Sequence, residues 1–420
     1  MFMKITKEYR FGGRYEIVVC GGGPSGVAAA VSAARKGAKT LLIEQGGCLG
    51  GFWTRGLLTW LIDTFDKGAL MDEVMERLES DADGKRFPNK SRFTADTEKT
   101  KLVFERMCLE SGVDFLYHTF VSGAVTDKRL IRSVLTESKS GPCYYDAAVF
   151  IDATGDGDLG FLCGASYEIG NEEGATQPMS LIAHVDGVTI CGTAYDSRYA
   201  PGKEAKAKLL EDIARAGLVP SYRYPHLAVL SEKYNSIGFM VDHEYGSGLS
   251  VKDVTEGTVR AREEIHKIVD GLRDQGGVWK DLRVTATADM IGVREGRRIK
   301  GLYRITADDV SEGKQFEDGI CTVTFNTDVH ALSSEKGKAF ESRYGTKHPP
   351  YQIPLRSLIS ADFDNLMMAG RCISGDFTAH ASYRVGGPAF RTGDAAGGCA
   401  ALCIEKGILP PEAVGMAGML

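Results

Sequence analysis

The sequence predicts an α/β fold in which a parallel sheet, split along the chain and carrying an inserted antiparallel meander, is combined with a second domain of mixed α+β structure. Two short apolar runs flank an alanine-rich segment near the N-terminus, which is the pattern of a parallel βαβ unit. Glycine accounts for 51 of the 420 residues, about 12% against a usual share of roughly 7%. Residues 351–420 return to the strand-and-helix pattern of the first unit, so we expect one domain to be split in sequence.

The βαβ unit begins with Glu16 to Cys20, a β-branched apolar run that stops at three glycines, as a buried parallel strand does. Pro24 then opens an alanine-rich helix that ends near Lys36 and Gly37. Proline favours the first helical position and glycine the position just past the end, which supports these limits. Thr40 to Glu44 completes the unit as a second strand.

The rest of the chain is read from its apolar periodicity and its turn residues. We expect, in chain order, helices over Ala69–Leu78 and Asp96–Glu110, an antiparallel meander over Asp114–Asp152, helices near Lys203–Ala216 and Val251–Arg273, a strand over Asn365–Ala369 and a helix over Pro388–Ile404. The expected domains are the first part of the sheet domain in residues 1–170, a substrate-facing domain in 171–350, and the remainder of the sheet domain in 351–420.

Composition narrows the function classes. Fifty Lys and Arg residues face 56 Asp and Glu residues, a net charge of -6, so no global field favours nucleic acid or an anionic membrane as a partner. The ten cysteines never form Cys-x-x-Cys, so we expect no zinc or iron–sulfur site and no bound metal. The N-terminus lacks the apolar stretch of a secretory signal, and no window approaches 18 consecutive apolar residues. We expect a cytoplasmic protein.

The segment GGGPSG carries the strongest motif. Gly21, Gly23 and Gly26 spell Gly-x-Gly-x-x-Gly between a strand and a helix, and Glu44 follows at the end of the next strand. Such a turn brings a pyrophosphate against the backbone and the positive end of the helix, while the acid accepts hydrogen bonds from a ribose diol. A 2′-phosphate would meet like charge at Glu44, so the motif favours FAD or NAD over NADP.

A second formal match, IDATGDGDLG, contains Gly155, Gly157 and Gly160. Its variable positions hold Asp156 and Asp158, and carboxylates oppose a pyrophosphate. We therefore expect a close-packed turn at a strand end that touches the cofactor through its backbone and leaves a carboxylate free for a hydroxyl. A purely structural turn is the alternative.

Taken with these motifs, the chain resembles FAD-dependent oxidoreductases with the glutathione-reductase-type FAD domain, and within them the group usually labelled FAD-dependent oxidoreductase. Further segments that carry the resemblance are GGCLGGFWT, QPMSL, VREGRRIKGLYRIT, YQIPLRSLI, NLMMAGRCIS and RVGGPAFRTGDAAGG. Fumarate reductase flavoproteins are similar only in the FAD domain. The resemblance implies a Rossmann-like FAD-binding domain and an enzyme.

The resemblance also implies which residues meet FAD. The pyrophosphate would meet Gly21, Gly23, Pro24, Ser25 and Gly26, and the adenosine ribose would meet Glu44. Gly50, Gly51 and Phe52 would run along the cofactor, with Val121 at the adenine. Gly155 would face the flavin side, Gly370 and Arg371 the ribityl chain, and Gly386 and Gly387 the pyrimidine edge. The last pair opens a helix whose dipole would stabilise negative charge on reduced flavin.

The glycine-rich loop after the second strand departs from two relatives. It holds a single cysteine, Cys48, where disulfide reductases carry two, and no histidine lies between Glu44 and Thr100. Fumarate reductases often tether FAD through a histidine near this loop. We therefore expect non-covalent FAD and no flavin-linked disulfide exchange.

Candidate catalytic residues precede the last helix in TAHASYRVGG. His380, with Tyr383 and Arg384, is expected to border the flavin ring, and a histidine there could accept a hydroxyl proton as hydride leaves. The alternative is a hydrogen-bonded loop histidine. His330 and His184 are weaker candidates.

A second group of candidates is the basic cluster of Arg294, Arg297 and Arg298 in VREGRRI. Guanidinium groups bind a substrate carboxylate in pairs of hydrogen bonds. Salt bridges to Glu295 or to a neighbouring domain are the competing interpretation for each arginine.

Because a flavin carries hydride chemistry itself, we expect an FAD enzyme that transfers a hydride between a small polar metabolite, through its hydroxyl, amine or activated C–C bond, and FAD. The alternatives are a flavin-dependent reductase of an activated double bond, an electron-transfer flavoprotein subunit and an NAD-only dehydrogenase. The expected partners are the small-molecule substrate and an unidentified electron acceptor, and self-association into a homo-oligomer stays open.

Overall fold

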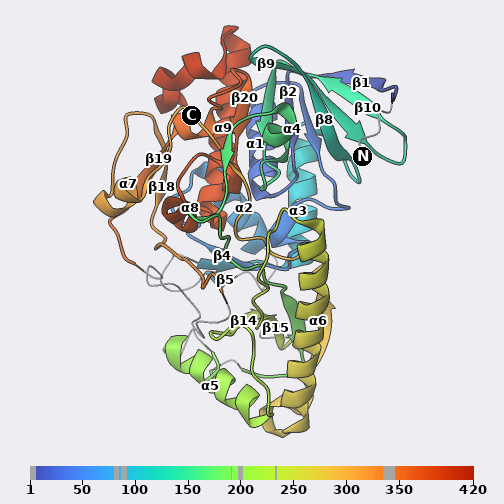
Figure 1. Cartoon of the computed structure of the whole chain (residues 1–420), viewed down its shortest axis with the longest axis vertical. Coiled ribbons are helices and arrows are strands. Elements are labelled where there is room, and N and C mark those ends of the chain that lie inside the picture. The colour runs from blue at the N-terminus through green and yellow to red at the C-terminus, as the bar shows by residue number, and fades with distance from the viewer. Residues whose placement is uncertain are drawn as a thin grey trace.

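A computed structural model describes residues 6–79, 85–86, 92–190, 192–196, 202–231, 234–333 and 346–420. The molecule is elongated. In Figure 1 a larger body contains segments near both ends of the chain, and a smaller body below it contains α5 (Gly202–Arg215), α6 (Val251–Asp274) and the strands between them. The candidate site lies where these two bodies meet.

A five-stranded parallel sheet forms the centre of the larger body. Its strands in spatial order are β20 (Leu366–Met368), β11 (Val149–Asp152), β2 (Ile17–Cys20), β3 (Thr40–Ile43) and β7 (Asp114–Leu116). Every neighbouring pair is parallel. The edge strand β20 comes from the C-terminal segment, so the split sheet domain predicted from the sequence is confirmed. Its central strand is buried at every position, as a strand covered on both faces must be.

Two helices from opposite ends of the chain pack together in this body. They are α1 (Pro24–Arg35) and α9 (Gly386–Lys406), which both contain many small residues. A Cβ atom on Gly393 would lie 2.0 Å from the Ser25 carbonyl oxygen, and one on Gly397 would lie 2.1 Å from that of Ala29. Only glycine permits the two helix backbones to approach this closely.

The predicted meander is present but shorter than Asp114–Asp152, as an antiparallel sheet of β8 (Phe120–Asp127), β9 (Leu130–Glu137) and β10 (Cys143–Asp146). The two ends of the predicted range, β7 and β11, belong instead to the parallel sheet. A fourth strand, β1 (Arg10–Arg14), pairs parallel to β10. The sequence did not predict β1, because its two central glycines disfavour a strand. The register shifts beside Gly13, which accommodates them as a bulge.

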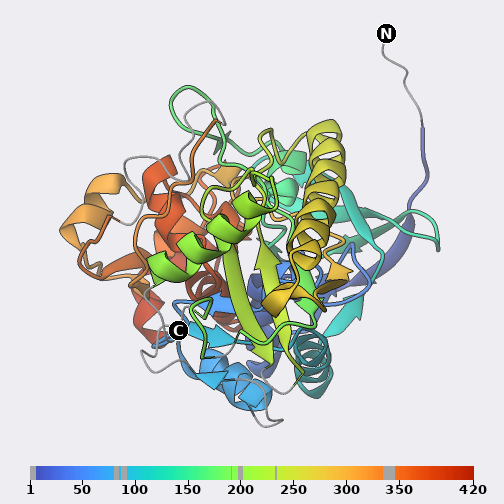
Figure 2. The ribbon, with the colours of Figure 1, turned by 90° about the horizontal axis from the view of Figure 1, so that it is seen from below.

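The smaller body has its own sheet and its own core. Its strand order is β14 (His226–Ser231), β15 (Ser236–Met240), β13 (Ala183–Asp186) and β16 (Arg283–Thr287), with every pair antiparallel. Figure 2 shows α5 and α6 crossing in front of this sheet. Apolar residues of α6, including Ile265, Val269 and Leu272, are buried with the sheet in one cluster.

The packing of residues 299–323 differs from the domain limits expected at 170 and 350. Ile299, Ile305 and Val323 belong to the core of the larger body, whereas the second core uses residues between Met179 and Val293 together with Leu57. The chain therefore re-enters the larger body about fifty residues before the boundary that we expected.

The remaining helices and strands connect or flank these two bodies. They are β4 (Trp60–Ile62), α2 (Ala69–Glu79), β5 (Lys85–Arg86), β6 (Arg92–Thr94), α3 (Thr97–Glu110), α4 (Asp158–Cys163), β12 (Tyr167–Glu168), β17 (Arg298–Ile299), α7 (Ala307–Glu312), β18 (Gly319–Val323), β19 (Tyr351–Pro354) and α8 (Phe377–Tyr383). Within the described ranges, no helix is both long enough and apolar enough to cross a membrane.

Candidate functional site

The turn from β2 into α1 has the form of a phosphate cradle. Gly23 is the N-cap residue of α1, and no side chain caps the first turn, so its backbone N–H groups are available to an anion. A Cβ on Gly23 would meet no atom within 4 Å, whereas one on Gly26 would lie 1.8 Å from the Gly21 carbonyl oxygen. Gly23 thus borders open space and Gly26 a tight contact, as the motif predicted.

Glu44 lies just beyond β3 and is 5% exposed. Its carboxylate accepts hydrogen bonds from the backbone N–H groups of Gly22 at 2.7 Å and Gly46 at 2.5 Å. The carboxylate joins the cradle to the next loop. Each oxygen retains acceptor capacity for a ribose hydroxyl.

The loop after Glu44 returns to the cradle. Gly51 has φ 49°, and a Cβ on it would lie 2.9 Å from Cα of Gly23. Phe52 reaches the other body, where a Cβ on Gly292 would lie 2.2 Å from its ring. At the meander, Thr119 N donates to the Glu44 carbonyl oxygen at 3.1 Å, which places the strand containing Val121 beside the same edge.

The second glycine motif forms a tight turn between β11 and α4. Gly155 and Gly157 both have positive φ, 82° and 66°. Asp156 pairs with Arg371 at 2.7 Å and Asp158 pairs with Arg297 at 2.9 Å. The expectation of a carboxylate free for a hydroxyl therefore does not match the structure, because both carboxylates are held by guanidinium groups. Burial and the neighbouring Asp156 raise the pKa of Asp158 to about 6.

The C-terminal segment closes the cradle from the opposite side. Gly370 has φ 80°, and a Cβ on it would lie 2.6 Å from Oγ of Ser25. Helix α9 begins at Gly386 with no side-chain cap. A Cβ on Gly387 would lie 1.7 Å from the Asp63 carbonyl oxygen. The predicted pyrimidine-edge residues thus form an uncapped helix start of the kind that favours an anion or a reduced ring.

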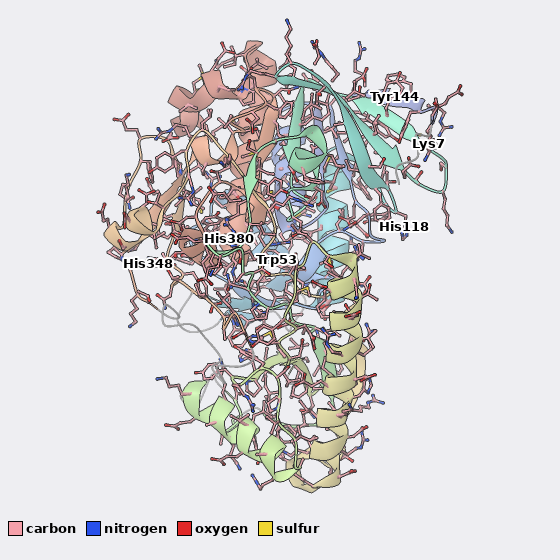
Figure 3. All side chains as sticks on the ribbon, viewed as in Figure 1. Lys7, Trp53, His118, Tyr144, His348 and His380 are labelled. Carbon is pink, nitrogen blue, oxygen red and sulfur yellow. The ribbon has the colours of Figure 1, made fainter. Side chains whose placement is uncertain are left out.

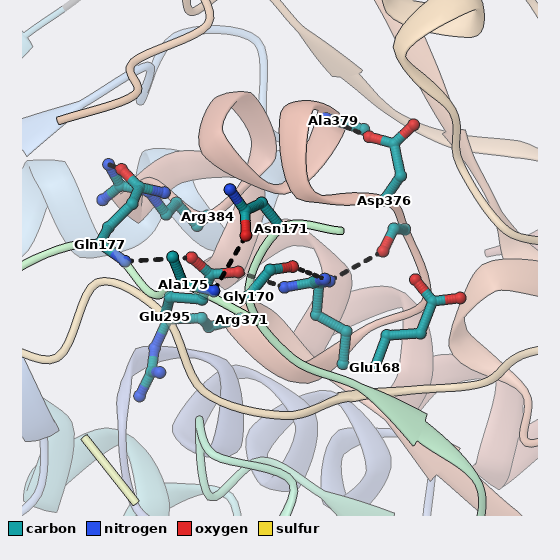
Figure 4. A network of polar contacts seen from close by, with 12 residues as sticks. Glu168, Gly170, Asn171, Ala175, Gln177, Glu295, Arg371, Asp376, Ala379 and Arg384 are labelled. Atoms are coloured by element: carbon teal, nitrogen blue, oxygen red, sulfur yellow. Dashed lines mark hydrogen bonds and ion pairs between the residues drawn. The ribbon is translucent and has the colours of Figure 1, made fainter. Parts of the chain in front are cut away.

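The arginine-rich segment after Gly292 runs between the two bodies. A Cβ on Gly296 would lie 2.0 Å from Oδ1 of Asp156, so the segment lies against the cradle. Arg298 is 2% exposed, pairs with Glu295 and donates to the carbonyl oxygens of Gly375 at 3.0 Å and Gly170 at 2.9 Å. Figure 4 shows this network, in which Gln177 N also donates to Glu295. Arg297 and Arg298 are thus engaged in ion pairs.

Arg294 differs from its two neighbours. It donates to the Pro178 carbonyl oxygen at 2.6 Å and to Oγ of Ser180 at 2.9 Å, and no carboxylate of the described residues lies within ion-pair distance of it. Burial lowers the pKa of Arg294. The guanidinium is therefore a desolvated cation without a direct counter-charge.

Arg384 lies at the end of α8, and its side chain is 11% exposed. One Nη atom donates to the Asp328 carbonyl oxygen at 2.9 Å and lies 3.4 Å from both Asp328 Oδ2 and Gln177 Oε1. Burial lowers its pKa to about 10, and Arg294 is among the charges that act on it. The structure thus brings two predicted arginines from distant segments to one place.

Unpaired buried polar atoms gather around these arginines. Within the described part of the chain, they include Nε of Arg384, Nε2 of Gln177, Oδ1 of Asp328 and Nδ1 of His243. Such atoms cost free energy unless a ligand or water satisfies them. Their concentration between the two bodies marks the candidate substrate site.

His243, Asp328 and Gln177 were not among the predicted site residues. His243 stacks on Tyr222 with ring centroids 4.0 Å apart, and its Nε2 lies 3.0 Å from Nδ1 of His330. Sequence reasoning had no signal for His243, because it meets residues 87 positions away only through the fold. The QPMSL segment was noticed only as a resemblance, although its first residue is Gln177.

His380 and Tyr383 are completely buried on α8. Figure 3 labels His380 in the larger body. Neither ring nitrogen of His380 has a hydrogen-bond partner, and burial together with Arg298, Arg384 and Arg371 lowers its pKa well below the usual value. The Tyr383 hydroxyl donates to the Ile373 carbonyl oxygen at 3.1 Å. His184, on β13, is also without a partner at Nε2.

The parallel sheet, the glycine turn into α1 and the acid just beyond β3 have the arrangement of a dinucleotide-binding protein. The family model for FAD dependent oxidoreductases matches residues 16–418. The chain belongs to this family, and its cofactor is FAD. A search of curated proteins gives no match.

Several solved structures share this fold. A geranylgeranyl bacteriochlorophyll reductase-like protein from Thermoplasma acidophilum is 13% identical with a TM-score of 0.53, over 97% of this chain and 83% of its own. An anhydrotetracycline hydroxylase from Streptomyces rimosus is 12% identical with a TM-score of 0.51, over 96% and 65%. A flavin-dependent brominase is 14% identical with a TM-score of 0.51, over 93% and 80%. At these identities the likeness shows the fold alone.

Proposed function

We propose that this enzyme transfers a hydride between FAD and a small metabolite that carries an anionic group, and that the transfer takes place at the junction between the two bodies. The observation that carries the proposal is Arg294, a desolvated guanidinium with carbonyl and hydroxyl partners but no counter-ion within the described residues. Such a cation is costly unless an anion joins it.

The charges around the junction support an anionic ligand. Arg294 and Arg384 both act there, while Asp328 contributes a single carboxylate, shared between Arg384 and His330. The pKa values of His243 and His330 are both lowered, chiefly by burial, so neither histidine adds positive charge at neutral pH. The cluster therefore carries an excess of about one positive charge, which a substrate carboxylate would offset.

Each side chain has a distinct task in this proposal. Bound FAD supplies the two-electron redox chemistry. Arg294 holds the anionic group, and Arg384, fixed by Asp328 and Gln177, orients the substrate with its planar donors. Unpaired Nε2 of Gln177 is a further donor for a substrate oxygen. The buried walls exclude water, which strengthens these contacts.

The test is anaerobic bleaching of the purified yellow holoenzyme with pairs of compounds that differ only in charge. Lactate is compared with propane-1,2-diol, and malate with its diamide. We expect bleaching by an anionic member and none by its neutral partner. If neutral alcohols bleach the flavin equally well, Arg294 does not select the substrate.

A matched pair of variants sharpens this test. Arg294→Gln should lose the preference for the anion, whereas Arg283→Gln, at an exposed position on β16, should keep it. Bleaching by dithionite followed by reoxidation with anionic enoates would instead establish the reverse direction, that of a double-bond reductase.

We also propose that FAD is held without a covalent bond. Cys48 is only partly exposed, its thiol contacts Oγ1 of Thr54 at 3.8 Å, and burial raises its pKa, so it is a poor nucleophile toward a flavin. Heat or acid should release all FAD into the supernatant. Flavin that stays with the precipitated chain would contradict this proposal alone.

A further inference from the structure

Three side chains form a continuous chain of contacts at the junction. Oδ2 of Asp328 lies 3.3 Å from Nε2 of His330, and Nδ1 of His330 lies 3.0 Å from Nε2 of His243. Asp328 and His330 follow β18, whereas His243 follows β15 in the smaller body. The contacts therefore connect the two bodies across the candidate substrate site.

The order of atoms fixes where the protons lie. Burial alone would raise the pKa of Asp328, but His330, Arg384 and Arg294 together hold it well below its usual range, so the carboxylate is ionised. An ionised carboxylate only accepts, so Nε2 of His330 must carry the proton between them. Burial lowers the pKa of His330 to about 4, so the ring is neutral at pH 7 and its Nδ1 is an acceptor.

The same reasoning extends to the next ring. Because Nδ1 of His330 accepts, Nε2 of His243 must donate to it. The pKa of His243 is lowered by burial, by Arg294 and by His330, so this ring is also neutral and its Nδ1 holds a lone pair. That Nδ1 is buried and has no hydrogen-bond partner. The chain of contacts thus ends in a proton acceptor.

We propose that Nδ1 of His243 accepts the proton of the substrate hydroxyl and that His330 and Asp328 act as positioning residues that keep this nitrogen unprotonated. The assignment rests on the proposed function and names the acid–base group of the same site. Stacking on Tyr222 at 4.0 Å fixes the ring plane of His243.

The step balances with the groups at hand. FAD held by the cradle would supply the two-electron oxidant for a 2-hydroxy acid, whose carbinol C–H hydrogen would leave as hydride with the electron pair of that bond. The O–H proton passes to Nδ1 of His243, and the carbinol becomes a carbonyl. Positive charge formed on the ring is stabilised through His330 by Asp328, as in other carboxylate-supported imidazole bases.

His380 offers no comparable support. Both of its ring nitrogens are buried without partners, and the charges that act on it are those of Arg298, Arg384 and Arg371. Protonation would place a fourth cation among these guanidinium groups. His243 also has one guanidinium near it, that of Arg294, but a positive charge on its ring would be linked through His330 to the carboxylate of Asp328.

The first test measures tautomers and does not need turnover. The holoenzyme, labelled with ¹⁵N in its eight histidines, is studied by long-range ¹H–¹⁵N correlation at pH 7. We expect His243 and His330 both to be neutral with the proton on Nε2, their signals assigned by loss in His243→Gln and His330→Gln. A proton on Nδ1 of His243, or two protons on that ring, would overturn the relay.

Asp328→Asn provides the matched perturbation. The new amide can donate to Nε2 of His330, which would move the His330 proton to Nδ1 and reverse the donor at His243. We expect the His243 signal to change to the Nδ1–H form in this variant.

The second test uses the 2-hydroxy acid that bleaches the flavin. His243→Gln should retain FAD and slow anaerobic flavin reduction by about 10²–10⁴-fold, as for loss of a general base. His266→Gln, an exposed change on α6, is the control. A large loss in His380→Gln with near wild-type reduction in His243→Gln would transfer the role to His380. If no 2-hydroxy acid bleaches the flavin, this substrate class is wrong, while the tautomers still decide the relay.

Discussion

Glu44 connects two backbone loops as well as facing the expected ribose. Its oxygens accept from Gly22 and Gly46, and Arg55 lies 3.5 Å from one of them. The acid is therefore part of the cradle before any cofactor contact is counted. A substitution here therefore changes the shape of the cradle as well as the expected contact with the ribose.

Glu44→Arg should weaken FAD binding by about 1–3 kcal/mol, the cost of leaving buried polar groups without partners. That range corresponds to roughly a 5- to 150-fold rise in the dissociation constant, measured by fluorescence titration of the apoprotein. Glu256→Arg, at an exposed position on α6, is the control. Unchanged FAD affinity in Glu44→Arg would show that Glu44 does not contribute to the cofactor site.

Arg294→Lys tests geometry at constant charge. Lysine retains the cation but loses the planar set of donors that now reach Pro178 and Ser180. We expect the substrate concentration for half-maximal flavin reduction to rise by roughly 10-fold, with a smaller change in the limiting rate, in stopped-flow measurements. Arg283→Lys on β16 is the control. A fall in the limiting rate alone would indicate that Arg294 acts on the chemical step rather than on binding.

At the scale of elements, the crossing of α1 and α9 couples the C-terminal segment to the cradle. Gly393 contacts the carbonyl of Ser25, which lies in the first turn of α1. The contact between α1 and α9 thus joins the residues expected at the pyrophosphate to those expected at the ribityl chain and the pyrimidine edge. Small residues in both helices have a structural reason beyond helix propensity.

Gly393→Ala should lower the free energy of unfolding by about 1–3 kcal/mol, because the new Cβ would overlap the Ser25 carbonyl and force the helices apart. Gly398→Ala is the matched control on the same helix. Its Cβ would meet no atom nearer than 3.4 Å, so this change should be neutral or stabilise by up to about 1 kcal/mol. The measurement is the melting temperature of the holoenzyme. Equal melting temperatures for the two variants would contradict the close contact.

Local signals allowed many of these elements to be predicted. Pro24 and the small residues after it define α1, and Asp96 caps α3, where its side chain accepts from Lys99 N. Elements without such signals were missed. The glycines of β1 obscured that strand, and residues 299–323 joined the larger core because of long-range packing that no local pattern encodes.

The candidate site likewise has one part that the sequence could predict and one part that it could not. The cradle residues were predictable because Gly21, Gly23, Gly26 and Glu44 belong to one contiguous motif with a fixed geometry. The junction was not, because His243, Asp328 and Gln177 come from three separate segments. Their chemistry depends on distances that exist only after the two bodies fold together.

At the scale of the whole molecule, neutral histidines are concentrated where the two bodies meet. Burial is the leading cause that lowers the pKa of His330 to about 4 and the pKa values of His243 and His380 further. In the unfolded chain a histidine gains its proton near pH 6.5. Folding must therefore exclude protons from these rings as the pH falls, which links the stability of the junction to acidity.

These histidines should lower the free energy of unfolding of the holoenzyme as the pH is lowered from 6.5 toward 4. Above pH 6.5, a histidine whose folded pKa lies below its unfolded pKa does not change the free energy of unfolding. Below pH 6.5 the unfolded chain binds a proton that the folded chain excludes, so the free energy of unfolding falls. Each such ring then costs about 1.4 kcal/mol per pH unit until its folded pKa is reached, so the three together cost about 4 kcal/mol at pH 5.5. Carboxyl groups whose pKa values are raised by burial act in the opposite sense, because the folded chain takes up their protons at a higher pH than the unfolded chain does. They are Asp158, whose pKa is raised to about 6, and Asp152, Asp242, Glu244, Glu264 and Glu295. The contribution of one ring is therefore read from a variant: His380→Gln should reduce the acid slope of the unfolding free energy by about 1.4 kcal/mol per pH unit, with His266→Gln as the exposed control. An acid slope in His380→Gln equal to that of the wild type would show that this ring is not held neutral by the fold.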